Sequence, residues 1–368
     1  MPSKLTLLAI VSVIFSKSLY AQTNNNRLEL TPFESLKVFT PDNNSIQGTI
    51  YGAELAYHFN MTRDSLDYVR ILHISAIDIV GSYRNLHSLT VNNDPALKGK
   101  LGDTYTLIGR FEIPLYQTGP VKLLFTPGFG FAYSSTSYFT NGNPLIGSRI
   151  NFAAQAGMKI ITAVSNSTGL QAGIDLLHYS NSGFRVPNHG INSINISFGI
   201  IQDMDSKGPA TPEHPYNYPY KHSFEFGGDI GMRGVFESKK YLYRSGLYAG
   251  YNYQLNQVFS LKAGVDAGSY FTVYNPKNNN ATFEGHATSY DRWRAGLSVG
   301  TDIALGKLAV MVGYGYYIHF NGYYPTKTYW TPGFKYYVLP WMAVQAKTYI
   351  HTNEADYLGL GLLFRVHP

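Results

Sequence analysis

The feature that most constrains this chain is an alternation of apolar residues with small or polar ones over segments of about ten residues, the length that lets a tilted strand cross a bilayer. Between residues 308 and 320 every second residue is apolar: Leu308, Val310, Val312, Tyr314, Tyr316, Ile318 and Phe320. A period of two is that of a β-strand with two different faces. Comparable segments occur at 49–59, 105–115, 121–133, 150–160 and 358–366.

The composition indicates which environment such strands face. The 368 residues include 31 Tyr, 21 Phe and 36 Gly. After the first 21 residues the sequence contains no run of 18 or more apolar residues, which excludes a spanning helix there. Aromatic, glycine-rich strands that are apolar on one face only are typical of a transmembrane β-barrel. We therefore predict an all-β, antiparallel outer-membrane barrel.

The number of barrels is open at this stage. About eight strands fall in the first half and six to eight in the second, and lipid requires that every strand edge be closed. One barrel of about 14 to 16 strands and two tandem eight-stranded barrels both satisfy this requirement. We favour the single barrel, because two closed barrels in one chain are unusual.

The chain divides into four parts. Residues 1–21 have an early lysine, an apolar run and a small residue at the end, which is the pattern of a secretory signal peptide. Residues 22–203 form a first barrel half. Residues 204–220 contain four prolines among polar residues, which predicts a periplasmic linker, and residues 221–368 form a second half.

Charge and residue types exclude several functions. The formal net charge of +6 is small and dispersed, which argues against nucleic acid and suits a surface among anionic lipid headgroups. The chain has no cysteine, and its histidines lack the spacing of metal ligands. We expect neither a metal nor a cofactor.

The strands around residues 170–200 carry the candidate chemistry. The alternation from Leu170 predicts a strand whose apolar parity continues through His178 and Ser180. A turn-rich link follows, and the alternation restarts at Asn192. A hairpin with this register carries all three side chains on its apolar face, beside the connecting loop.

A serine and a histidine at positions i and i+2 of a strand are roughly 6.6 Å apart on one face, a span their side chains can close. A nucleophilic hydroxyl needs such a base, and the base needs a third group to fix its tautomer. The alternative interpretation is that His178 and Ser180 are polar residues at the rim of an apolar strand, anchoring it near water.

The segments His178-Tyr-Ser-Asn-Ser-Gly183 and Pro187-Asn-His-Gly-Ile-Asn192 resemble the signature of the outer-membrane lipid A 3-O-deacylase (PagL-like) family. The resemblance covers residues 46–203. It implies a barrel with a lipid-facing site, His178 as base, Ser180 as nucleophile, and Asn181 and Gly183 near the oxyanion. Asn192 stands where the family usually has glutamate, so it would be the third member.

The end of the second half repeats the plan of this hairpin, although it lacks the His-x-Ser pattern. The nearest remnant is His351-Thr-Asn353. We assign no chemistry there.

The leading hypothesis is an outer-membrane hydrolase that removes an ester-linked acyl chain from lipid A, its lipopolysaccharide partner in the outer leaflet. Asn192 predicts a slow enzyme. The alternative is a catalytically inactive barrel that acts as a pore or as a structural protein of the outer membrane. The sequence leaves self-association open.

Overall fold

The computed structural model describes residues 25–42, 44–62, 64, 66–207, 220–236, 238–274, 287–322, 326–352 and 354–368. The expected signal peptide and most of the expected linker lie outside these ranges. The helical segments are short: α2 (Asp67–Ile71), η1 (Pro95–Leu97) and α3 (Tyr138–Asn141). No helix in the described ranges has the length and apolarity to cross a membrane.

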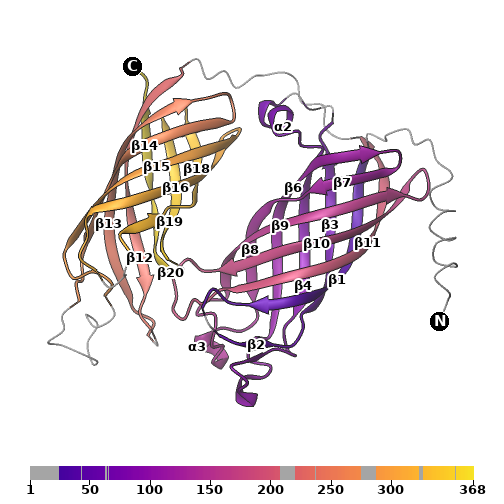
Figure 1. The fold of residues 1–368 in the computed structure, drawn as a ribbon, viewed down its shortest axis with the longest axis horizontal. Coiled ribbons are helices and arrows are strands. Elements are labelled where there is room, and N and C mark those ends of the chain that lie inside the picture. Colours follow the sequence, from indigo (N-terminus) through magenta and orange to yellow (C-terminus); the bar gives the residue numbers. More distant parts are fainter. Residues whose placement is uncertain are drawn as a thin grey trace.

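The first half of the chain forms one closed antiparallel sheet (Figure 1). Its strands are β1 (Asn25–Phe39), β3 (Tyr51–Asn60), β4 (Ala76–Asn85), β6 (Asp103–Thr118), β7 (Val121–Phe125), β8 (Gly128–Ser134), β9 (Ile150–Ala163), β10 (Thr168–Ser180) and β11 (Ile191–Lys207). Pairing of β1 with β11 closes the ring. Both β7 and β8 pair with β6 and β9, so this barrel has eight strand positions. A separate ribbon joins β2 (Ile46–Gln47) to β5 (Thr90–Val91).

The second half forms another closed sheet. Its strands are β12 (His222–Gly234), β13 (Tyr241–Gln254), β14 (Phe259–Tyr270), β15 (Trp293–Leu305), β16 (Leu308–His319), β17 (Thr328–Trp330), β18 (Gly333–Leu339), β19 (Met342–His351) and β20 (Glu354–Val366). Pairing of β12 with β20 closes this ring. Both β17 and β18 pair with β16 and β19, which again leaves eight positions.

The predicted class, an all-β antiparallel outer-membrane barrel, is confirmed. The strands are divided between two tandem eight-stranded barrels, which was the alternative, and a single barrel of about 14 to 16 strands is not what forms. The physical reason is that alternation assigns the two faces of a strand and says nothing about which strand closes the ring. The first barrel also extends to Lys207, so residues 204–207 are strand where a linker was expected.

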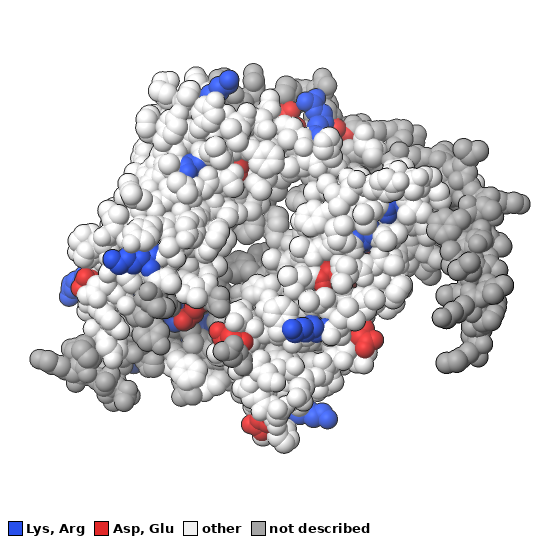
Figure 2. Space-filling model, viewed as in Figure 1, with Lys and Arg blue, Asp and Glu red and all other residues white. Residues whose placement is uncertain are grey.

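Alternation separates an apolar outer wall from a polar lumen. On β11, Phe198 and Ile200 point outward with 62% and 56% of their surface exposed, whereas the neighbouring Asn195 is buried inside. Figure 2 shows charged side chains only as isolated groups on a largely uncharged surface. Such a wall suits lipid.

Ion pairs between distant strands fill the two lumens. In the first barrel the Lys159 Nζ lies 2.8 Å from a Glu29 carboxylate oxygen. In the second barrel the Lys335 Nζ lies 2.7 Å from Glu225 and 2.6 Å from Asp302. These buried charges therefore have partners, as burial in a protein interior requires.

Apart from the 61–75 connection that carries α2, the connections at one end of the first barrel are short, and longer ones lie at the other end. The turns β6–β7 and β15–β16 are two residues long, and Gly119 and Gly306 supply the positive φ (50° and 70°) that such turns need. The long connections 135–149 and 181–190 lie at the other end, with α3 and β2, away from α2 (Figure 1). Short turns of outer-membrane barrels face the periplasm, which assigns the 181–190 loop to the outside.

Candidate active site

The hairpin of β10 and β11 has the register that the sequence predicts. His178 pairs directly with Asn192 across the two strands. Ser180 is the last residue of β10, and it follows His178 on the same face. The next outward residues toward the membrane centre are Leu176 and Ile174, both exposed. The three polar side chains therefore lie on the outer wall, at the edge of its apolar band beside the 181–190 loop.

The three side chains form a continuous hydrogen-bonded chain. The His178 Nδ1 lies 2.8 Å from the Asn192 Oδ1, and the His178 Nε2 lies 3.1 Å from the Ser180 Oγ. An amide oxygen only accepts, so Nδ1 carries the hydrogen and Nε2 is left as the acceptor for the Ser180 hydroxyl. This is the tautomer in which an imidazole can take a proton from a serine.

The surroundings of the imidazole differ on its two sides. Asn192 is 8% exposed, and His178 is partly buried between β9 and β11. On the β9 side the register partner of His178 is Ala154, and that of Ser180 is Phe152. Ala154 is small and exposed, so the wall beside the imidazole is open on the β9 side.

Asn181 is buried and organises the loop from within. Its backbone N–H donates to the Asn188 Oδ1 at 2.8 Å, its side-chain amide donates to the Arg185 carbonyl at 2.9 Å, and its Oδ1 accepts from the Arg185 N–H at 3.1 Å. Both the amide of Asn181 and its backbone donor therefore have partners inside the loop.

The structure places Gly183 at the far side of the loop, against the second barrel. Its φ is +77°, a region that favours glycine, and its carbonyl accepts a hydrogen bond from the Gly234 N–H at 2.9 Å. A β-carbon at Gly183 would lie 2.7 Å from the Ala355 carbonyl oxygen. The structure thus groups His178, Ser180 and Asn192 closely, with Gly183 at the opposite boundary of the loop.

The site is also supported by two residues that sequence reasoning did not single out. Gly190 has φ +68°, and a β-carbon there would lie 2.9 Å from the His178 Cε1, so the ring packs directly on this backbone. Asn188 anchors Asn181, as described above. The glycine and asparagine in the link indicated a turn, but their contacts with the site depend on the closed loop and have no sequence signal.

The corresponding hairpin of the second barrel places its histidine differently. His351 at the end of β19 is buried inside the lumen, where its Nε2 lies 2.9 Å from the Tyr317 hydroxyl. On the other side its Nδ1 lies 3.7 Å from the Asp356 carboxylate. His351 therefore belongs to a buried polar network, whereas His178 lies on the outer wall.

Within the described residues, one group of side chains has the donor spacing of a metal site. Ligand atoms of Glu29, His58 and Glu112 lie within 4.8 Å of one another in the first lumen. Lys159 and Arg27 already pair with these carboxylates. Because cations of the chain hold the acidic oxygens, we assign no metal to this group.

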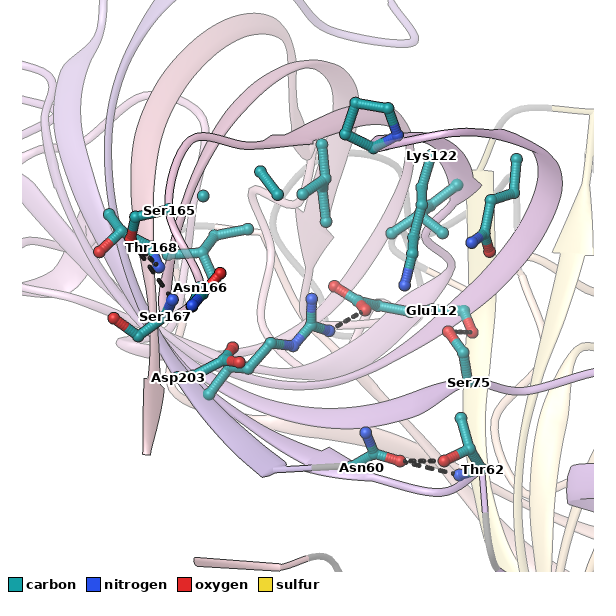
Figure 3. Close-up of a pocket in the computed structure, with 18 of the residues that line it drawn as sticks. Asn60, Thr62, Ser75, Glu112, Lys122, Ser165, Asn166, Ser167, Thr168 and Asp203 are labelled. Atoms are coloured by element: carbon teal, nitrogen blue, oxygen red, sulfur yellow. Dashed lines mark hydrogen bonds and ion pairs between the residues drawn. The ribbon is translucent and has the colours of Figure 1, made fainter. Parts of the chain in front are cut away.

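A cavity of about 130 Å³ opens at the periplasmic end of the first barrel, lined by β-turn residues and by Glu112, Lys122 and Asp203 (Figure 3). It lies at the end of the barrel opposite to Ser180. Its labelled serine, threonine and asparagine side chains bond mainly to their own turns, for example Thr62 to Asn60. It brings no nucleophile together with a base.

Comparisons with known proteins agree on the region of this hairpin. A family model described as lipid A 3-O-deacylase (PagL) matches residues 53–200, and one described as the acyloxyacyl hydrolase C-terminal domain matches residues 222–368. The comparison with curated proteins gave no match. The first match begins within β3 and ends within β11, and it includes both strands of the site.

The solved structures to which the chain is similar include an outer-membrane enzyme and a neisserial surface protein. The outer membrane enzyme PagL is 15% identical, with a TM-score of 0.29, covering 46% of this chain and 97% of that chain. Neisserial surface protein A is 10% identical, with a TM-score of 0.32, covering 50% of this chain and 98% of that chain.

Proposed function

Because the chain belongs to the lipid A 3-O-deacylase (PagL) family of the bacterial outer membrane, we propose that it hydrolyses one ester-linked acyl chain of lipid A, with Ser180 as nucleophile. The observation that carries the proposal is the chain of hydrogen bonds from Ser180 through His178 to Asn192 on the lipid-facing wall. A substrate whose acyl chains already lie in the outer leaflet meets this wall without leaving the membrane.

The reaction proceeds in two steps. The Ser180 Oγ attacks the ester carbonyl carbon while its proton moves to the His178 Nε2, and the tetrahedral intermediate expels the sugar oxygen, which takes that proton. Water then attacks the acyl-serine, gives a proton to the same nitrogen and releases the fatty acid as Ser180 recovers its hydrogen. Water reaches the site from the loop side, where the hairpin ends.

Asn192 holds the imidazole without adding charge. Its oxygen fixes the Nδ1 hydrogen, but a neutral amide cannot offset the imidazolium formed during the attack. We therefore propose a slow enzyme. That Asn181 and Gly183 lie near the oxyanion stays a prediction. The hydrogen bonds of Asn181 favour a supporting role, in which Asn181 shapes the loop and the remaining backbone N–H groups of the loop stabilise the intermediate.

The test is mass spectrometry of lipid A incubated with the purified, reconstituted protein. We expect the wild type to remove one hydroxyacyl chain, and Ser180→Ala and His178→Asn each to reduce the rate by at least about 10³-fold, the usual scale for removing such a group. Ser182→Ala is the matched control, because Ser182 is in the same loop and outside the hydrogen-bonded chain to His178.

Folding is followed by the heat-dependent shift in gel mobility that closed barrels show. The mobility shift should be the same in the wild type and in both variants, since the Ser180 and His178 side chains are on the outer wall. Wild-type activity in Ser180→Ala would mean that the nucleophile is misassigned.

The competing function is a catalytically inactive structural barrel, which the neutral Asn192 favours. It predicts lipid A of unchanged mass with the wild type, at any enzyme concentration and after long incubation.

A further inference from the structure

The loop that connects β10 to β11 rests on the second barrel. The Gly234 N–H, at the end of β12, donates to the Gly183 carbonyl at 2.9 Å. A β-carbon on Gly234 would lie 2.8 Å from both the Arg185 Cα and the Val186 nitrogen. Backbone of one barrel therefore lies directly against backbone of the other, with no space for even a methyl group between them.

An aromatic contact extends this junction. Tyr241, the first residue of β13, has its ring 5.1 Å from the Phe184 ring and 4.3 Å from the Arg185 guanidinium carbon. The same guanidinium lies 5.7 Å from the Phe139 ring of the first barrel. Arg185 is thus held between aromatic rings of both barrels, an arrangement that favours a cation.

The opposite side of the same loop holds the site. Gly190 packs on the His178 ring, and Asn181 next to Ser180 is bonded to Arg185 and Asn188. These bonds make residues 181–190 one connected unit that reaches from the second barrel to His178. A shift of the Arg185 end therefore moves the residues around Ser180.

We propose that the second barrel is a positioning domain, which holds the 181–190 loop in place so that Ser180, His178 and the loop backbone keep a reactive geometry. The inference rests on the proposed deacylase function. The loop has no regular secondary structure, and fixing it costs conformational entropy that contacts elsewhere must offset. A misplacement of about 1 Å in a site can reduce a rate 10²-fold, so these contacts bear directly on turnover. Gly234 and Tyr241 are positioning residues.

The first experiment measures kcat and KM of full-length variants in the reconstituted deacylation assay. Tyr241→Ala should lower kcat about 10-fold or more with a smaller change in KM, because it loosens the loop and leaves the lipid-binding wall intact. Tyr241→Phe keeps the ring over Arg185 and should restore kcat to near the wild-type value, which a general loss of stability would not do.

The second pair of variants tests the backbone contact. Gly234→Ala inserts a methyl group against Arg185 and should lower kcat in the same way. Gly228→Ala is the matched control on the same strand, where the nearest atom to the new β-carbon is 3.3 Å away and the loop is not involved. Equal kcat values in wild type, Tyr241→Ala and Gly234→Ala would overturn the inference.

A readout independent of activity separates this inference from the proposed function. Trypsin cleavage between Arg185 and Val186, measured by mass spectrometry of the peptide ending at Arg185, reports release of the loop. We expect at least about 10-fold faster cleavage in Tyr241→Ala and Gly234→Ala than in wild type and Gly228→Ala, because cleavage requires local opening. Unchanged cleavage overturns the anchoring of the loop even if Ser180→Ala abolishes deacylation. Faster cleavage in these two variants, together with a wild type that shows no deacylase activity, would support the anchoring and reject the function.

Discussion

At the scale of single residues, the neutral amide of Asn192 sets the expected rate. In the serine protease from which the triad logic derives, replacing the carboxylate by its amide costs on the order of 10⁴ in kcat. The Asn192 oxygen already lies 2.8 Å from the His178 Nδ1, so the orienting contact is present and only the charge is missing. A carboxylate oxygen in the place of the Asn192 amide oxygen would make the same contact with the His178 Nδ1.

We predict that Asn192→Asp, which keeps the present geometry, and Asn192→Glu, which introduces the residue that the resemblance implies at this position, each accelerate deacylation. The gain should be about 10-fold or more, equivalent to about 1.4 kcal/mol. It should appear only at pH values where the new carboxylate is ionised, so kcat is measured from acid to neutral pH. Asn192→Leu is the control that removes the acceptor and should slow the enzyme. Unchanged rates in both acidic variants would mean that another group orients His178.

At the scale of elements, the loop between β10 and β11 depends on the conformation of Gly190. Its φ of +68° is one that a side chain adopts only at a cost of roughly 1–2 kcal/mol. A β-carbon there also meets the His178 ring. Both effects act on His178, the proposed base.

We predict that Gly190→Ala lowers kcat at least about 10-fold, because a shifted imidazole no longer reaches both the Ser180 Oγ and the Asn192 oxygen. Gly142→Ala is the matched control: Gly142 has φ +75° at the end of α3, in another outer loop, and no atom lies within 4 Å of its added β-carbon. The two variants share the backbone penalty, so a difference in kcat isolates the contact with His178. Equal kcat values in Gly190→Ala and Gly142→Ala would mean that Gly190 does not position His178.

The hairpin itself was predictable, since alternation runs unbroken to Ser180 and restarts at Asn192, and a one-residue change of register would have moved all three side chains to the other face. The interior of the loop was not. The bonds of Asn181 with Arg185 follow only from the folded loop. The contact of Gly183 with Ala355 joins residues that are 172 positions apart in the chain. No local pattern encodes them.

At the scale of the whole molecule, the alternation predicted a barrel but not how many. Each strand of an eight-stranded barrel and of a larger one has the same apolar outer face, so hydropathy is equal in both. The lumens distinguish them, because an eight-stranded ring is only wide enough for side chains. The pairs Lys159–Glu29 and Lys335–Glu225 span these narrow interiors.

We predict that neither barrel conducts ions. The buried pairs cross the lumen between strands on different sides of the ring, and opening a path would leave charges without partners, at about 3–5 kcal/mol for each broken pair. Planar bilayers with the reconstituted protein should show no single-channel steps, under conditions in which a general porin gives them. Regular steps of defined conductance would contradict the closed lumens and would favour a pore.

The place of Ser180 on the outer wall has a kinetic consequence. An enzyme with a pocket draws substrate from water, and its rate follows bulk concentration. In the proposed reaction the substrate lies in the same lipid leaflet as the enzyme, so encounters occur by diffusion in two dimensions. Turnover should then follow the mole fraction of lipid A among its neighbouring lipids. Diluting mixed micelles with buffer should leave the rate per enzyme unchanged, whereas diluting them with an inert detergent should lower it.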